Sequence, residues 1–282
     1  MPESRAERPR RFDAIGQLLV VISLATLTAT MIEGPHAGWQ SVPILGGFVI
    51  AILAIVALLA HARRAAAPLI DLRFFSSWPF AAATGLAVLA FAAFNGALFL
   101  SSLYLQQARG LPPTMAGLCM LPIAVALVVC APISGRLVSS GHTRTVLVIA
   151  GIAIAIGGVL ITGADLETPI AQVVLALGIF GIGFGAINPP ITNAAVSGMP
   201  RARAGVAAGL ASTSRQVGAS LGVALAGSIA AADGHDPGFS ESTHPFWWAV
   251  CACGLAIVVL GLISTGVRAK RSVQTLDAAM SD

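Results

Sequence analysis

The sequence predicts an all-α polytopic membrane protein with eight transmembrane helices. Apolar residues make up 56% of the 282 residues and charged residues only 10%, whereas soluble domains carry roughly 25% charged residues. Eight apolar stretches have about the 20 residues that a helix needs to cross a bilayer. Lysine and arginine gather in alternate connections between these stretches, which is typical of multi-pass membrane proteins.

The predicted spans follow one another along most of the chain, and none alternates apolar and polar residues as barrel strands do. They cover Ala14–Ile32, Val42–Ala60, Phe80–Leu105, Ala116–Val138, Val146–Thr162, Ile170–Val196, Val206–Ala231 and Phe246–Val267. The fifth span is short and needs Thr145 and Gly163 to be drawn into the bilayer. The third and sixth are long, so we expect them to tilt, kink or extend past the membrane surface.

The basic residues predict the orientation. Of the 16 Lys and Arg residues, 14 lie on one set of connections and flanks, Arg109 lies on the other set, and Arg215 lies inside a span. The positive-inside rule therefore predicts that both termini are cytoplasmic. The net charge of +4 is then an excess on one side of the membrane, so we expect the lipid bilayer and no nucleic acid as a partner.

The chain offers no pattern typical of an enzyme. All four cysteines lie within spans, and the five histidines lie in loops or at span ends without the paired spacing of a zinc site. No Gly-rich phosphate-binding loop is present. We therefore expect no catalytic residues, no metal and no cofactor.

Arg215 is the most informative polar residue. It lies about ten residues into the seventh predicted span, roughly 15 Å deep at 1.5 Å per residue. A charge at that depth should face the protein interior or water. It could contact an anionic substrate or a carboxylate of a coupling pathway, or it could only hold the bundle together through backbone carbonyls. None of the 12 carboxylates lies inside a span, so its counter-ion is expected outside this chain.

Two spans carry features of a cavity between bent helices. In the sixth, Gly181 and Gly185 precede Asn188, Pro189 and Pro190, which we expect to interrupt the helix. In the seventh, Gly205 with Gly209 and Gly218 with Gly222 form two G-x-x-x-G pairs that favour close packing. Polar residues placed to line the substrate pathway are Asn95, Asn188, Asn193, Arg215 and Gln216.

These residues form a pattern that resembles a known family. Gly205–Gly209, followed by Ser212–Gly218 and Gly222, resembles the penultimate span of the 14-span drug:proton antiporters of the major facilitator superfamily. Three further stretches match that group in order: Pro68–Leu72; Leu103–Gln107 with Ala116–Gly117 and Leu121–Pro122; and Gly183–Gly185 with Pro189–Pro190. One departure is visible, because Ser139 and Ser140 replace the acidic and basic pair of the family's G-x-L-x-D-R-x-G loop.

The resemblance implies that the chain is the C-terminal portion of such a protein. It then divides into a cytoplasmic segment (1–13), two extra linker helices (14–60), a cytoplasmic loop (61–79), a six-helix transporter half (80–267) and a cytoplasmic tail (268–282). An N-terminal six-span half, carrying the buried acids of the family, would be missing.

The function implied is proton-driven export of drugs or toxic amphipathic molecules by alternating access across a cell inner membrane, with the proton gradient as energy source. Two alternatives remain open. The chain could belong to a metabolite importer of the same superfamily, or it could be a non-transporting half-transporter subunit or the remnant of a split gene.

Overall fold

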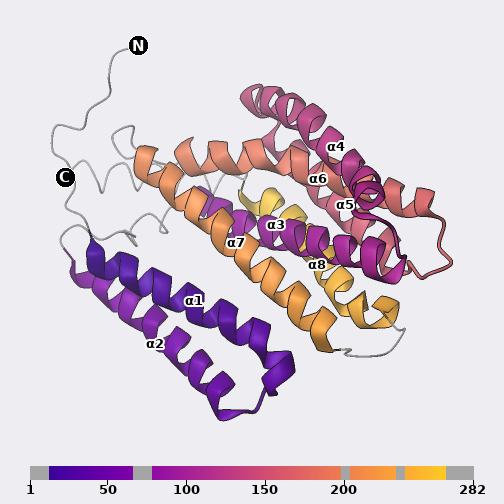
Figure 1. Ribbon diagram of the computed structural model, residues 1–282. Coiled ribbons are helices and arrows are strands. Elements are labelled where there is room, and N and C mark those ends of the chain that lie inside the picture. Colours follow the sequence, from indigo (N-terminus) through magenta and orange to yellow (C-terminus); the bar gives the residue numbers. More distant parts are fainter. Residues whose placement is uncertain (1–12, 66–77, 198–203, 233–238, 265–282) are drawn as a thin grey trace.

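A computed structural model of the chain describes residues 13–65, 78–197, 204–232 and 239–264 (Figure 1). Within these residues the chain forms helices and no strands. The α-helices are α1 (Ala14–Ala37), α2 (Val42–Arg64), α3 (Trp78–Leu103), α4 (Pro113–Ser139), α5 (Thr143–Thr162), α6 (Ile170–Ser197), α7 (Ala204–Ala232) and α8 (Phe239–Ser264), and a π-helical turn η2 (Tyr104–Ala108) continues α3.

The eight helices correspond to the eight predicted spans, and the predicted all-α polytopic membrane fold is confirmed. Most helices are longer than predicted because their polar ends continue the helix beyond the apolar stretch. The predicted end of the last span, Val267, lies outside the described residues.

Seven helices in the described part of the chain are long and apolar enough to cross a membrane, and α7 is not among them. With 29 residues α7 is long enough. Its polar stretch Ser212–Gln216 therefore distinguishes it from the others. Helix α7 is as long as a spanning helix must be, but it is less apolar than the prediction requires.

Helices α3–α8 pack as one bundle, and the α1–α2 hairpin lies beside it (Figure 1). Within the bundle the largest interfaces join α3 to α7, α4 to α6, and α5 to α8 and α6, while α1 contacts α7. The hairpin is closed at one end by Asp13, whose carboxylate accepts a hydrogen bond from the Gly16 N–H (2.8 Å) and lies 2.9 Å from His61 Nε2. Within the bundle, α3, α6 and α7 all contact one another.

Glycines bring the backbones of paired helices close together. A Cβ at Gly218 or Gly222 of α7 would collide with the backbone carbonyls of Val88 and Ala92 in α3. In α6, a Cβ at Gly181 would lie 2.8 Å from the Cα of Ile123, and one at Gly185 would lie 3.0 Å from the Cα of Leu127, both in α4. A Cβ at Gly209 would meet no described atom within 4 Å, and the surroundings of Gly205 lie outside the described residues.

The expectation that Asn188, Pro189 and Pro190 interrupt the sixth span is wrong, because α6 runs without a break from Ile170 to Ser197. Pro190 has no N–H and cannot bond the carbonyl of Ala186 four residues earlier. Ser134 of α4 occupies that vacancy, and its hydroxyl donates to the Ala186 carbonyl at 2.6 Å. A neighbouring helix thus satisfies the carbonyl that the proline leaves free, as membrane helices with internal proline require.

Candidate functional site

The predicted polar residues divide between a cluster and an exposed pair. Asn95 lies on α3, Asn188 on α6 and Arg215 on α7, and all three are partly buried where these helices meet. Asn193 and Gln216 are exposed, and neither makes a hydrogen bond within the described residues.

Arg215 is held by weak contacts. Its Nη1 donates to the Thr192 hydroxyl at 3.4 Å, and its guanidinium carbon lies 6.0 Å from the ring centroid of Phe91. Ion pairs from the described residues do not include Arg215. A guanidinium with one long hydrogen bond and one aromatic face retains N–H donors that can bind a further acceptor.

An aromatic cluster lies beside Arg215. Phe91 packs edge-on against Phe184 with ring centroids 5.0 Å apart, and Phe94 stacks on Phe184 at 3.7 Å and on Phe180 at 6.2 Å. Phe180 and Phe184 are buried, whereas Phe91 and Phe94 are partly exposed. The cluster presents an apolar wall next to a cation.

Sequence reasoning missed these phenylalanines. A signal was present, since Phe91 and Phe94 are three residues apart and Phe180 and Phe184 four apart, so each pair shares one helix face. Only the packing of α3 against α6 shows that the two faces meet.

The two asparagines are tied to this cluster through the backbone. The Asn95 side-chain amide donates to the carbonyl of Phe91 at 2.9 Å, and that of Asn188 donates to the carbonyl of Phe184 at 3.1 Å. Each bond stays within one helix, so among the described residues neither asparagine bridges helices. Thr192 donates to the Asn188 carbonyl at 3.1 Å, which links Asn188 to the contact of Arg215.

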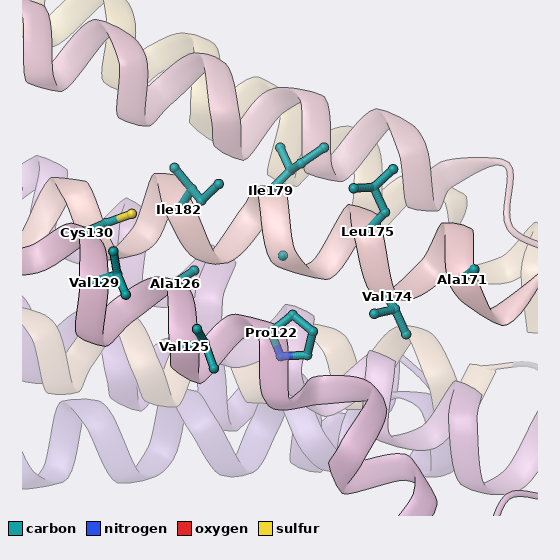
Figure 2. A pocket seen from close by; sticks show the side chains of 11 residues that line it. Pro122, Val125, Ala126, Val129, Cys130, Ala171, Val174, Leu175, Ile179 and Ile182 are labelled. Carbon is teal, nitrogen blue, oxygen red and sulfur yellow. The ribbon is translucent and has the colours of Figure 1, made fainter.

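A separate apolar groove of about 560 Å³ runs between α4 and α6 (Figure 2). Its lining includes Pro122 and Gly178, and valine, leucine, isoleucine and alanine side chains form most of its walls. The lining includes Cys130 but no Asp, Glu, His, Lys or Arg and none of the predicted site residues.

A polar cluster fastens the end of α3 to the connection between α5 and α6. The Tyr104 hydroxyl donates to the carbonyl of Asp165 at 2.6 Å. Arg109 donates to the carbonyls of Thr168 (2.7 Å) and Asp165 (3.2 Å) and to the Tyr104 oxygen (3.1 Å). The Asp165 carboxylate accepts from the Thr168 hydroxyl and from two backbone N–H groups. The Thr168 hydroxyl and these N–H groups hold the pKa of Asp165 below its usual value.

The described residues contain no cluster of three side chains able to hold a metal ion. The side chains that the fold brings together offer a cation, aromatic faces, hydroxyls and amides. These groups are suited to binding a ligand. Fold and apolar helices together define a multi-pass membrane protein.

The chain belongs to the Major Facilitator Superfamily, whose profile matches residues 5–223. The family expected from the sequence motifs is thereby confirmed. Three similar proteins are the multidrug resistance protein Stp of Mycobacterium tuberculosis (35% identity), the tetracenomycin C resistance and export protein of Streptomyces glaucescens (34%) and the methylenomycin A resistance protein of Streptomyces coelicolor (33%).

The aligned regions cover 82%, 82% and 92% of this chain but only 43%, 43% and 53% of the respective relatives. The chain therefore spans about half the length of the curated relatives it matches.

Proposed function

We propose that this chain is the C-terminal portion of a proton-driven exporter of drugs or toxic amphipathic molecules. The observation that carries the proposal is Arg215, a cation within a membrane helix that has no carboxylate partner among the described residues. The aromatic wall of Phe91 and Phe94 lies beside it. The names of the relatives, which concern drug resistance and export, support the direction of transport.

The proposed energy source is the proton gradient. The carboxylates of the described residues lie at helix ends or in connections, namely Asp13, Glu33, Asp165, Glu167 and Glu241. Proton coupling needs a group that loads and releases a proton inside the membrane. We assign that group to the missing N-terminal six-span half, and Arg215 to the cavity that the two halves enclose. No cofactor is required in this scheme.

The membrane arrangement completes the proposal. The chain lies in the cell inner membrane with both termini cytoplasmic, because the connections rich in arginine then face the cytoplasm. Six helices, α3–α8, form the transporter half, and the α1–α2 hairpin beside the bundle (Figure 1) corresponds to the two linker helices. Alternating access is then rocking of this half against its partner around the Arg215 site.

Drug accumulation tests the proposal. Cells producing the native protein should hold less of a fluorescent amphipathic drug than cells lacking it, and dissipating the proton gradient should remove the difference. Arg215→Ala should abolish export while the amount of protein in the membrane stays the same, and Arg215→Lys should retain part of the activity. Unchanged export by Arg215→Ala would refute the role of this residue, and higher accumulation in producing cells would favour the importer.

A second candidate rests on the coverage of the relatives. A chain spanning 43–53% of similar proteins could act as a half-transporter subunit or remain from a split gene. Purification of the native protein distinguishes these, since a subunit should copurify with a separate chain carrying six further spans.

A further inference from the structure

The structure places one long-range side-chain hydrogen bond at the proline pair of α6. Ser134 donates to the Ala186 carbonyl at 2.6 Å, and both residues are buried, at 2% and 8% exposed. This carbonyl is the one that Pro190 leaves without a helical partner. Because water is absent from the hydrocarbon core, a neighbouring side chain is the group available to satisfy it.

The bond lies between two differently held parts of α6. On the side toward Ile170, Gly181 and Gly185 press against the backbone of α4, so this part of α6 follows α4. On the other side of Pro190, Thr192 donates to the Asn188 carbonyl and accepts from Arg215 of α7. The part beyond the proline thus carries the hydroxyl that contacts the cation.

We propose that Ser134 is a positioning residue, whose hydrogen bond to Ala186 fixes the course of α6 at Pro190 and so holds Thr192 within reach of Arg215. The hydrogen bond of Ser134 is made to α6 and not to Arg215, so the proposed effect on the cation passes through α6. The consequence for transport rests on the function proposed above, whereas the effect on α6 does not.

Hydrogen–deuterium exchange of the purified native protein tests the effect on α6 without requiring transport. Ser134→Ala should speed exchange in peptides covering residues 187–197 by about three- to twenty-fold, the range that corresponds to the loss of one interhelical hydrogen bond in a membrane. Ser134→Thr keeps the hydroxyl and should stay near the native rate. Ser228→Ala is the matched control, because Ser228 is also buried but bonds within its own helix. Native exchange rates in Ser134→Ala would overturn the proposal.

Pro190→Ala isolates the cause. Alanine at 190 restores a backbone N–H to the Ala186 carbonyl, so Ser134 is no longer needed there. In that background Ser134→Ala should change exchange by less than about two-fold, because the two variants act on one acceptor. An effect as large as in the native background would overturn the proposal, since it would mean that Ser134 acts through packing.

Transport provides the second readout. If the native protein exports the drug, Ser134→Ala should raise KM more than it lowers the maximal rate, because the site is misplaced rather than removed. In the Pro190→Ala background, KM and the maximal rate should be the same with and without Ser134→Ala. Absence of export by the native protein would refute the proposed function alone, and the exchange experiment would still decide the role of Ser134.

Discussion

At the scale of single residues, Gly222 allows α7 to lie against the backbone of α3. A Cβ there would collide with the carbonyl of Ala92, which cannot move aside as a side chain would. Gly209, in the same helix, has open space around its missing Cβ within the described residues. Close helix packing therefore requires glycine at position 222 but not at position 209.

We expect Gly222→Val to destabilise the folded protein by about 1–3 kcal/mol, because overpacking must push α3 and α7 apart. Gly209→Ala should be neutral or stabilising, by up to about 1 kcal/mol, since alanine favours helix over glycine. Thermal unfolding of the purified variants measures the difference. Equal midpoints for the two variants would contradict the close packing of α3 and α7.

The lowered pKa of Asp165 predicts that the connection between α5 and α6 is sensitive to acid. Its pKa is lowered in the fold, so the ionised form stabilises the folded connection. That contribution is complete above the ordinary pKa of about 4 and is lost as the pH falls through the lower, folded value. Limited proteolysis of residues 163–169 at decreasing pH should show faster cleavage in this acidic range. Asp165→Asn should cleave faster at neutral pH and lose the pH dependence.

At the scale of elements, the π-helical turn η2 orients Tyr104 and Arg109 toward the connection that follows α5. The Arg109 N–H bonds the Tyr104 carbonyl across this turn at 2.9 Å, and the Arg109 guanidinium carbon lies 5.9 Å from the Tyr104 ring centroid. Both side chains then bond backbone carbonyls of residues 165 and 168. The end of α3 is thereby fastened to the start of α6.

Tyr104→Phe should loosen this junction by about 0.5–1.5 kcal/mol for the lost hydrogen bond to Asp165. Arg109→Ala should loosen it further, because the Thr168 carbonyl loses its side-chain donor and the Asp165 carbonyl keeps only that of Tyr104. Hydrogen–deuterium exchange of residues 104–111 and 163–170 should rise together in both variants. A rise confined to one segment would show that the junction does not couple them. Gln106→Ala is the control, since Gln106 is exposed and bonds Ser102 within its own segment.

At the scale of the whole molecule, the native protein should be larger than the 28.6 kDa of this chain. Six additional spans at about 20 residues each, with connections, add roughly 20 kDa. Tagging the chromosomal C-terminus and blotting membranes should show a band of about 50 kDa on this reckoning. A band at the mass of this chain would instead direct the search to a partner chain or to a dimer.

Much of the fold could be predicted from composition and periodicity, because a bilayer requires each spanning segment to be apolar and to satisfy its own backbone. The positions of seven helices follow from this, whereas α7 is long enough to span but less apolar. The site could be predicted only in part. Arg215 was evident, since a charge in an apolar span is costly, whereas Phe91 and Phe184 are ordinary apolar residues until α3 and α6 are paired.

The sequence by itself determined the membrane class, the helix order and the family, because these depend on local apolarity and on motifs within single segments. Tertiary structure decided what no single segment contains. It set Ser134 of α4 against Ala186 of α6. Pro189 and Pro190, which were expected to interrupt the sixth span, therefore lie within one continuous helix. It also brought Thr192 of α6 to Arg215 of α7. Both contacts join residues far apart in the chain, and hydrogen bonds between helices depend on how the helices pack, which local sequence does not encode.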